Sequence, residues 1–221
     1  MSSTEPFDPT KHWRPRLALQ YICALFACYI VAAGITVFAF TETHSFAGNS
    51  TGAALINISG FVFMLALAIP FAKVKSAGEF NLAFGLVRAR EQHLLLAAAA
   101  GLILQICYIY AVNGGLHHLQ FKRSFDLWTV AILLAPFFEE PVMRGFIYTA
   151  FRKPLSIAPS LIAVVLTSFL LHPSKISRSF QAIVAITLLN ILACLFRERA
   201  RSLWNCIACH LAFNTVAAIT V

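Results

Sequence analysis

The sequence predicts an all-α protein, a polytopic bundle of seven or eight helices that cross a membrane. Hydrophobic residues make up 59% of the chain and charged residues only 12%, whereas soluble domains carry about 25% charged residues. Apolar runs recur along the chain at the roughly 20 residues that a helix needs to cross a bilayer core of about 30 Å. Seven of the nine acidic residues lie in or beside the polar connections between these runs. Composition and charge placement therefore indicate a multi-pass membrane protein.

Seven apolar runs are taken in order as the predicted spans. They lie near 17–40, 53–72, 93–112, 127–150, 158–172, 180–196 and 203–221. The fifth and sixth are short, so we expect a tilt or support from neighbouring helices, and an eighth span or half-span would change the side on which the C-terminus lies. Because no repeat or linker interrupts the chain, 1–221 is interpreted as one membrane domain with a cytoplasmic tail at 1–16.

The basic residues predict the orientation, because lysine and arginine accumulate in cytoplasmic loops. With the N-terminus inside, twelve of them lie on the cytoplasmic side, four lie outside and Arg144 lies in the membrane. We therefore expect an integral protein of the inner or plasma membrane with a cytoplasmic N-terminus. Its net charge of +8 does not indicate nucleic acid, because the basic residues lie in pairs at the ends of apolar runs. The lipid bilayer is the predicted partner.

Two adjacent carboxylates, Glu139 and Glu140, lie inside the fourth predicted span. A charge at the bilayer centre costs roughly 2.5 to 3.5 kcal/mol on insertion scales, so an acid there is a candidate functional group. Arg144 follows Glu140 by four residues, which predicts an ion pair on one helix face. Glu139 points about 100° away and remains as the carboxylate suited to general-base chemistry. Pro141 removes a backbone donor and predicts an irregular helix at this point.

Three polar residues of later spans are further candidates. His210 and Asn214 are four residues apart, so they project from one face of the last helix. Both can donate hydrogen bonds, and together they could hold a developing oxyanion. His172 ends an apolar run, where a histidine is as often only an interfacial residue. With the boundaries above, His172 and His210 lie about 21 Å and about 10 Å from the inner end, so they meet only if a helix boundary shifts.

This pattern resembles the CAAX protease and bacteriocin-processing family, the intramembrane glutamate proteases also called the Abi family. The first family motif, Glu-Glu-x-x-x-Arg, is complete from Glu139 to Arg144. The late motif, His-x-x-x-Asn, is complete from His210 to Asn214. The resemblance covers roughly 127–221, which are interpreted as the motif-bearing helices.

The second motif departs from the family pattern. The family has a phenylalanine four residues before the histidine, whereas Ser168 stands four residues before His172 and Phe169 stands three before it. This difference changes the residue expected to pack against His172, whereas the histidine of the motif is present. The resemblance implies that His172 helps to position or polarise the attacking water.

The resemblance implies roles for the other motif residues and a hydrolytic activity. Glu139 would activate a water molecule, and His210 with Asn214 would stabilise the tetrahedral oxyanion. Glu140 with Arg144 would hold the geometry. The implied activity is cleavage of a peptide bond in a membrane-associated protein or peptide, without a cofactor. Prenylated C-termini, bacteriocins and membrane-anchored sorting signals all remain open as substrates.

Three other interpretations remain. Glu139, His172 and His210 are suitable zinc ligands, and zinc could activate the water instead. The run from Cys206 to His210 matches the Cys-x-x-Cys-His pattern of haem attachment, which is short and easily matched by chance. A non-enzymatic carrier or assembly protein could use both glutamates and Arg144 in a structural network that locks helices together.

Overall fold

The computed structural model describes most of the chain from Phe84 onward and a short N-terminal helical segment. The described residues are 14–24, 27, 81, 84–115, 127–152, 154–172, 176–177 and 179–219. Every regular element among them is a helix and none is a strand, which confirms the all-α class. The predicted span 53–72 lies outside the described residues, and 17–40 enters them mainly through a helix at 15–24. The single-domain interpretation stays a prediction.

The last five predicted spans each coincide with helical structure. In chain order the elements are α4 (Glu91–Asn113), α5 (Leu127–Glu140), the π-helix η2 (Pro141–Tyr148), α6 (Thr149–Arg152), α7 (Ile157–Leu171), α9 (Phe180–Ala200) and α10 (Leu203–Ile219). Among the described helices, α4 and α9 are long and apolar enough to cross a membrane, while α7 and α10 are shorter apolar helices. The count of seven or eight spans therefore stays a prediction.

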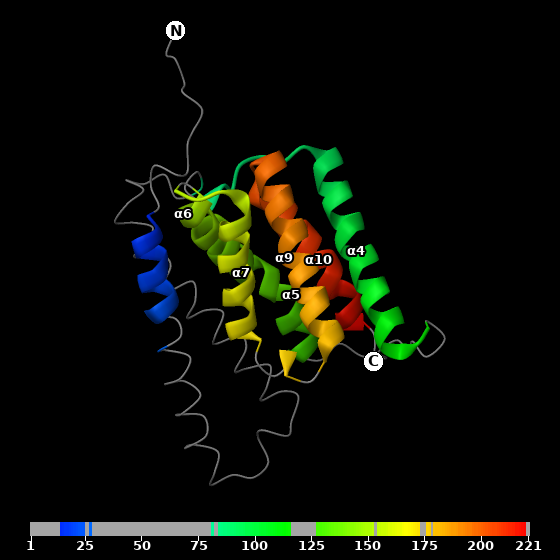
Figure 1. Cartoon of the computed structure of the whole chain (residues 1–221). Coiled ribbons are helices and arrows are strands. Elements are labelled where there is room, and N and C mark those ends of the chain that lie inside the picture. Colours follow the sequence, from blue (N-terminus) through cyan, green and yellow to red (C-terminus); the bar gives the residue numbers. More distant parts are fainter. Residues whose placement is uncertain are drawn as a thin grey trace.

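Helix α10 lies at the centre of the described bundle. It packs against α4, α5, α9 and η2, and Figure 1 shows α9 and α10 between α4 on one flank and α7 on the other. Gly101 permits the close approach of α4, because a Cβ at this position would overlap the carbonyl oxygen of Cys209. Small residues at such contacts are typical of helix packing in membranes. The late motif is thus carried by a helix that contacts four of the other described elements.

The outer face of α4 is apolar and exposed. Leu95 is 71% exposed, Leu96 61%, Ile103 60% and Tyr110 59%. Only 22% of the most apolar stretch of α4 is buried inside the molecule, whereas a core helix of a soluble protein would be mostly buried. An apolar helix that presents this face outward fits contact with lipid.

A non-helical segment over residues 85–90 crosses the end of the bundle before α4 begins. The N–H of Leu203 donates to the carbonyl oxygen of Gly85 at 2.7 Å, and the Ser202 hydroxyl donates to the carbonyl oxygen of Val87 at 2.6 Å. These bonds hold the segment against the turn between α9 and α10. Gly85 has a φ of 74°, the left-handed region that glycine adopts at little cost. The start of α10 is therefore held by two hydrogen bonds to this segment.

Candidate active site

The predicted site begins where a regular α-helix becomes a π-helix. Pro141 is the first residue of η2 and has no N–H for the carbonyl one turn earlier, so the α-helical pattern is interrupted there. The hydroxyl of Thr149 donates to the carbonyl oxygen of Arg144 at 2.9 Å near the other end. Single turns of π-helix are frequent at functional sites. The irregular backbone predicted from Pro141 is confirmed, and it lies directly after the two carboxylates.

Glu140 is the centre of the polar contacts. Its side chain is fully buried, and its Oε1 accepts from Arg144 Nη1 at 2.9 Å. The same oxygen lies 2.7 Å from His210 Nδ1. The ion pair predicted between Glu140 and Arg144 is confirmed. Because an ionised carboxylate can only accept, the proton of this contact belongs to Nδ1 of His210.

Glu139 has a different environment, although it is the next residue. Its residue exposure is 8%, and it forms no hydrogen bond or ion pair with the described part of the chain. Arg144 instead contacts Glu140, as the difference in direction along the helix predicts. The structure thus separates the two neighbouring carboxylates into one that is held and one that has no partner among the described residues.

Asn214 lies on α10 beside α5. Its Nδ2 donates to the carbonyl oxygen of Ile132 at 2.9 Å. A side-chain amide carries two N–H groups, so this bond uses one of its two donors. His210 also contacts the helix pair of α5 and η2, through Glu140. His210 and Asn214 therefore both face α5, His210 at Glu140 and Asn214 about two turns earlier, at Ile132.

Asn190 of α9 is a part of the site that the sequence motifs missed. Its Oδ1 accepts from Arg144 Nη2 at 2.8 Å and from Ser168 Oγ at 3.0 Å. Asn190 is 3% exposed. The available signal was an amide in the interior of the apolar run 180–196, whose other amide, Gln181, lies at its start. Buried amides in membrane helices are expected to form hydrogen bonds between helices.

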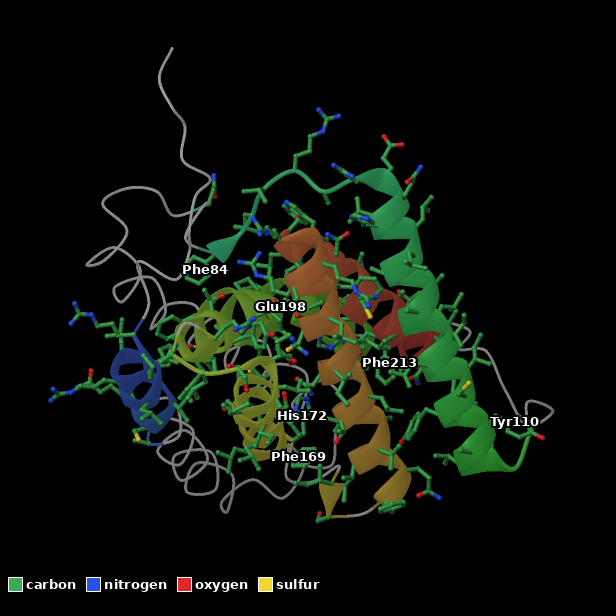
Figure 2. The ribbon with its side chains drawn as sticks, turned by 45° about the horizontal axis from the view of Figure 1, so that its top comes forward. Phe84, Tyr110, Phe169, His172, Glu198 and Phe213 are labelled. Carbon is green, nitrogen blue, oxygen red and sulfur yellow. The ribbon has the colours of Figure 1, made fainter. Side chains whose placement is uncertain are left out.

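His172 follows the last residue of α7. Figure 2 shows it at this end of the helix, beside α9. Its Nδ1 lies 2.9 Å from the carbonyl oxygen of Ser168, and because a carbonyl only accepts, Nδ1 carries the proton. Ser168 in turn bonds to Asn190. His172 is thus linked to the Glu140 network through Ser168 and Asn190.

Two buried polar atoms of this network form no hydrogen bond among the described residues. They are Oε2 of Glu140 and Nε of Arg144. Most buried polar atoms in proteins are paired, and the exceptions concentrate where a group has a functional role. The network therefore keeps one acceptor, Oε2 of Glu140, and one donor, Nε of Arg144, that no described residue uses.

A second polar cluster joins η2 and α6 to α9, near the C-terminal end of α9. Oε1 of Glu198 accepts from the Tyr148 hydroxyl and from Arg152 Nε, both at 2.9 Å. Figure 2 shows Glu198 on α9, toward the end that carries the segment over 85–90. The hydrogen bond to Glu198 raises the pKa of Arg152. This bridge is partly exposed and holds the helices that flank the site.

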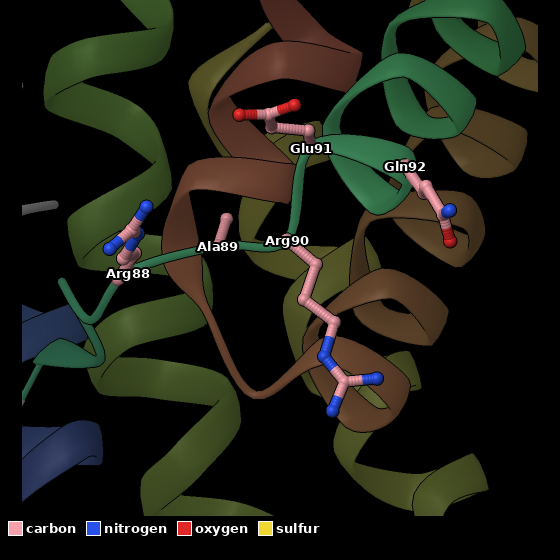
Figure 3. A pocket seen from close by; sticks show the side chains of 5 residues that line it. All are labelled: Arg88, Ala89, Arg90, Glu91 and Gln92. Atoms are coloured by element: carbon pink, nitrogen blue, oxygen red, sulfur yellow. The ribbon is translucent and has the colours of Figure 1, made fainter.

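A surface pocket lies away from these residues. It is lined by residues 88–92, where the non-helical segment meets α4, and Figure 3 shows Arg88, Arg90 and Glu91 around it. None of its lining residues belongs to the three motifs. The polar network inside the bundle, and not this pocket, is the candidate site.

The two rival chemistries receive no support from the geometry. No three His, Cys, Asp or Glu side chains among the described residues converge closely enough to hold a metal ion. Cys206 and Cys209 are fully buried between helices, and Cys206 Sγ donates to the carbonyl oxygen of Ala193 at 3.2 Å. The cysteines of the haem-like pattern thus act as small packing residues.

Comparison with known proteins gives one match. Residues 122–216 match the family model described as type II CAAX prenyl endopeptidase Rce1-like. The matched range contains all six predicted site residues, while the first 121 residues lie outside it. No curated protein and no solved structure matches the chain. The match confirms the family resemblance predicted from the motifs.

Proposed function

Because residues 122–216 match the family model described as type II CAAX prenyl endopeptidase Rce1-like, we propose that this protein is an intramembrane endopeptidase. It hydrolyses a peptide bond of a membrane-associated protein or peptide. The observation that carries the proposal is the difference between the two carboxylates. Glu140 is held by Arg144 and His210, whereas Glu139 is buried beside them without a partner among the described residues.

Glu139 is the proposed general base. It takes a proton from a water molecule, and the resulting hydroxide attacks the carbonyl carbon of the scissile bond. The tetrahedral intermediate then collapses, the C–N bond breaks, and the proton passes to the leaving amine. His172 orients the attacking water. Its Nδ1 lies 2.9 Å from the Ser168 carbonyl oxygen, and this contact fixes the direction of the ring.

His210 and Asn214 are the proposed oxyanion donors. Asn214 has one amide N–H beyond the bond to Ile132. His210 can donate from Nε2 only when both ring nitrogens carry protons, because Nδ1 already donates to Glu140. Donors fixed in position before the reaction are the ones that contribute most to such stabilisation. Glu140, held by Arg144, orients the ring of His210.

The substrate class is tested with the whole chain reconstituted in lipid vesicles. The family name refers to CAAX prenyl endopeptidases, so the first substrate is a farnesylated peptide that ends in a CAAX sequence. We expect release of the C-terminal tripeptide, measured by mass spectrometry. The same peptide without its prenyl group, and an unmodified membrane-anchored peptide, distinguish a prenyl-dependent enzyme from a broader one. Absence of cleavage of all three would contradict the proposed function.

The metal-free mechanism is part of the proposal. The same cleavage assay with an excess of a zinc chelator should give an unchanged rate. A rate that disappears with chelator and returns with added zinc would favour the zinc-dependent alternative. A chain that binds the farnesylated peptide without cleaving it would favour the carrier or assembly protein.

A further inference from the structure

Asn190 connects three helices through one side chain. Its Oδ1 accepts from Arg144 Nη2 of η2 at 2.8 Å and from Ser168 Oγ of α7 at 3.0 Å. Its Nδ2 donates to the carbonyl oxygen of Ile186 in its own helix at 2.7 Å. This last bond fixes the orientation of the amide, so that its oxygen faces the other two helices.

The contact with Arg144 places the guanidinium between two acceptors. Nη1 donates to Glu140 and Nη2 donates to Asn190. A guanidinium presents its donors in a rigid plane, so two acceptors on different nitrogens determine its direction. Arg144 is only 2% exposed. Without Asn190, the guanidinium would keep Glu140 and the Cys194 thiol as partners, and neither of them links it to α7.

The contact between Asn190 and Ser168 links Asn190 to His172. Ser168 is 5% exposed, and its backbone carbonyl accepts from His172 Nδ1. Asn190 therefore stands in the middle of a hydrogen-bonded chain that runs from His210 through Glu140 and Arg144 to Ser168 and His172. Ser168 occupies the position where the family pattern has phenylalanine, so its hydroxyl makes a contact that the family pattern does not supply.

We propose that Asn190 is a positioning residue of the hydrolytic site. It fixes Arg144 and α7 relative to each other, and so holds His210 and His172 toward the same peptide bond. The inference rests on the proposed function. Asn190 would act through Arg144 and Ser168 and would not itself touch the reacting atoms. A misplacement of about 1 Å can cost about 10²-fold in rate, so a residue of this kind acts on turnover more than on binding.

The test compares the kinetics of Asn190→Leu and Ser168→Ala with those of the unchanged chain in vesicles. We expect Asn190→Leu to lower kcat about 10- to 100-fold and Ser168→Ala about 3- to 10-fold, each with KM within about twofold. The double variant should be no slower than Asn190→Leu, because both remove the same link. Thr187→Val and Thr167→Val are the matched controls. Each removes a hydroxyl that bonds only to its own helix, and each should keep kcat.

The proposal is overturned if folded Asn190→Leu, or Ser168→Ala where Asn190→Leu does not accumulate, keeps kcat within about twofold. A rise in KM with unchanged kcat would also overturn it, because that pattern indicates lost binding. Glu139→Gln in the same assay separates the two proposals. If Glu139→Gln is inactive and the Asn190 and Ser168 variants are fully active, only the role of Asn190 fails. If Glu139→Gln is fully active, the proposed mechanism fails.

Discussion

Glu139 and Glu140 show how far the environment of one residue can differ from that of the next. Glu140 shares one oxygen between Arg144 and His210, so its charge is compensated inside the bundle. Glu139 has no such partner among the described residues. A buried charge without compensation is costly and is retained where it has a function. The pair therefore divides into a structural carboxylate and a reactive one.

Replacement of the structural carboxylate should destabilise the protein. Glu140→Gln removes the carboxylate that is hydrogen-bonded to the buried Arg144 cation, and breaking a buried pair costs about 3 to 5 kcal/mol. We expect a lower midpoint of thermal unfolding in detergent and weaker accumulation in the membrane.

Glu198→Gln is the control for this variant. It removes the acid of the partly exposed bridge to Arg152, a kind of pair that contributes about 1 kcal/mol or less. Equal losses of stability from Glu140→Gln and Glu198→Gln would argue against a central structural role for Glu140.

At the scale of elements, the site depends on how closely the helices approach α10. Gly101 of α4 faces the backbone of Cys209, one residue before His210 in α10. Gly145 of η2 similarly faces Phe84, whose ring would meet an added Cβ at 2.7 Å. Helix α4 thus approaches α10 through Gly101, and η2 approaches Phe84 through Gly145. A larger side chain at either glycine would push the two packed segments apart.

Gly101→Ala tests the approach of α4 to α10. The added methyl group overlaps a backbone oxygen that cannot move alone, and overpacking of this kind costs about 1 to 3 kcal/mol. We expect a lower unfolding midpoint, with reduced peptide cleavage because α10 carries His210. Ala99→Leu adds more volume on the exposed side of the same helix and should leave the midpoint unchanged. An unchanged midpoint for Gly101→Ala would show that the helices do not pack as described.

At the scale of the whole molecule, the connections expected in the cytoplasm meet at one end of the bundle. Gly85 and Val87 bond to the turn between α9 and α10, and Arg152 bonds to Glu198 near the end of α9. These contacts place three basic connections, predicted separately to lie inside, on the same side. That these connections share one end agrees with placing them together, and the cytoplasmic location of this end stays a prediction.

Reporter fusions test this orientation. A reporter that is active only outside the membrane should be inactive after Arg90 and after Ser202, and active after Gly115. Charge distribution is the physical reason, since twelve basic residues are predicted inside and four outside. Activity after Arg90 together with inactivity after Gly115 would reverse the predicted topology.

The sequence predicted the helices because apolar runs of membrane length leave little choice of structure. The bounds of the last five predicted spans, which fall within the described part of the chain, differ from the helices there by four residues or fewer. The Glu140–Arg144 pair was predictable because it depends on spacing within one helix. Asn190 and Ser168 were not predictable as partners, because hydrogen bonds between helices depend on rotation and depth that no single run of sequence encodes. The exact extent of η2 was hidden for the same reason, although Pro141 indicated an irregular backbone.

The most direct test of the central claim compares cleavage by Glu139→Gln with cleavage by the unchanged chain, at equal protein and in the same vesicles. Gln has nearly the same shape as Glu but cannot take a proton from water, and a positioned general base contributes about 10²- to 10⁴-fold. We therefore predict a rate reduced by at least about 10²-fold, with an unchanged unfolding midpoint and unchanged peptide binding. A Glu139→Gln protein that cleaves the peptide at the wild-type rate would contradict the account.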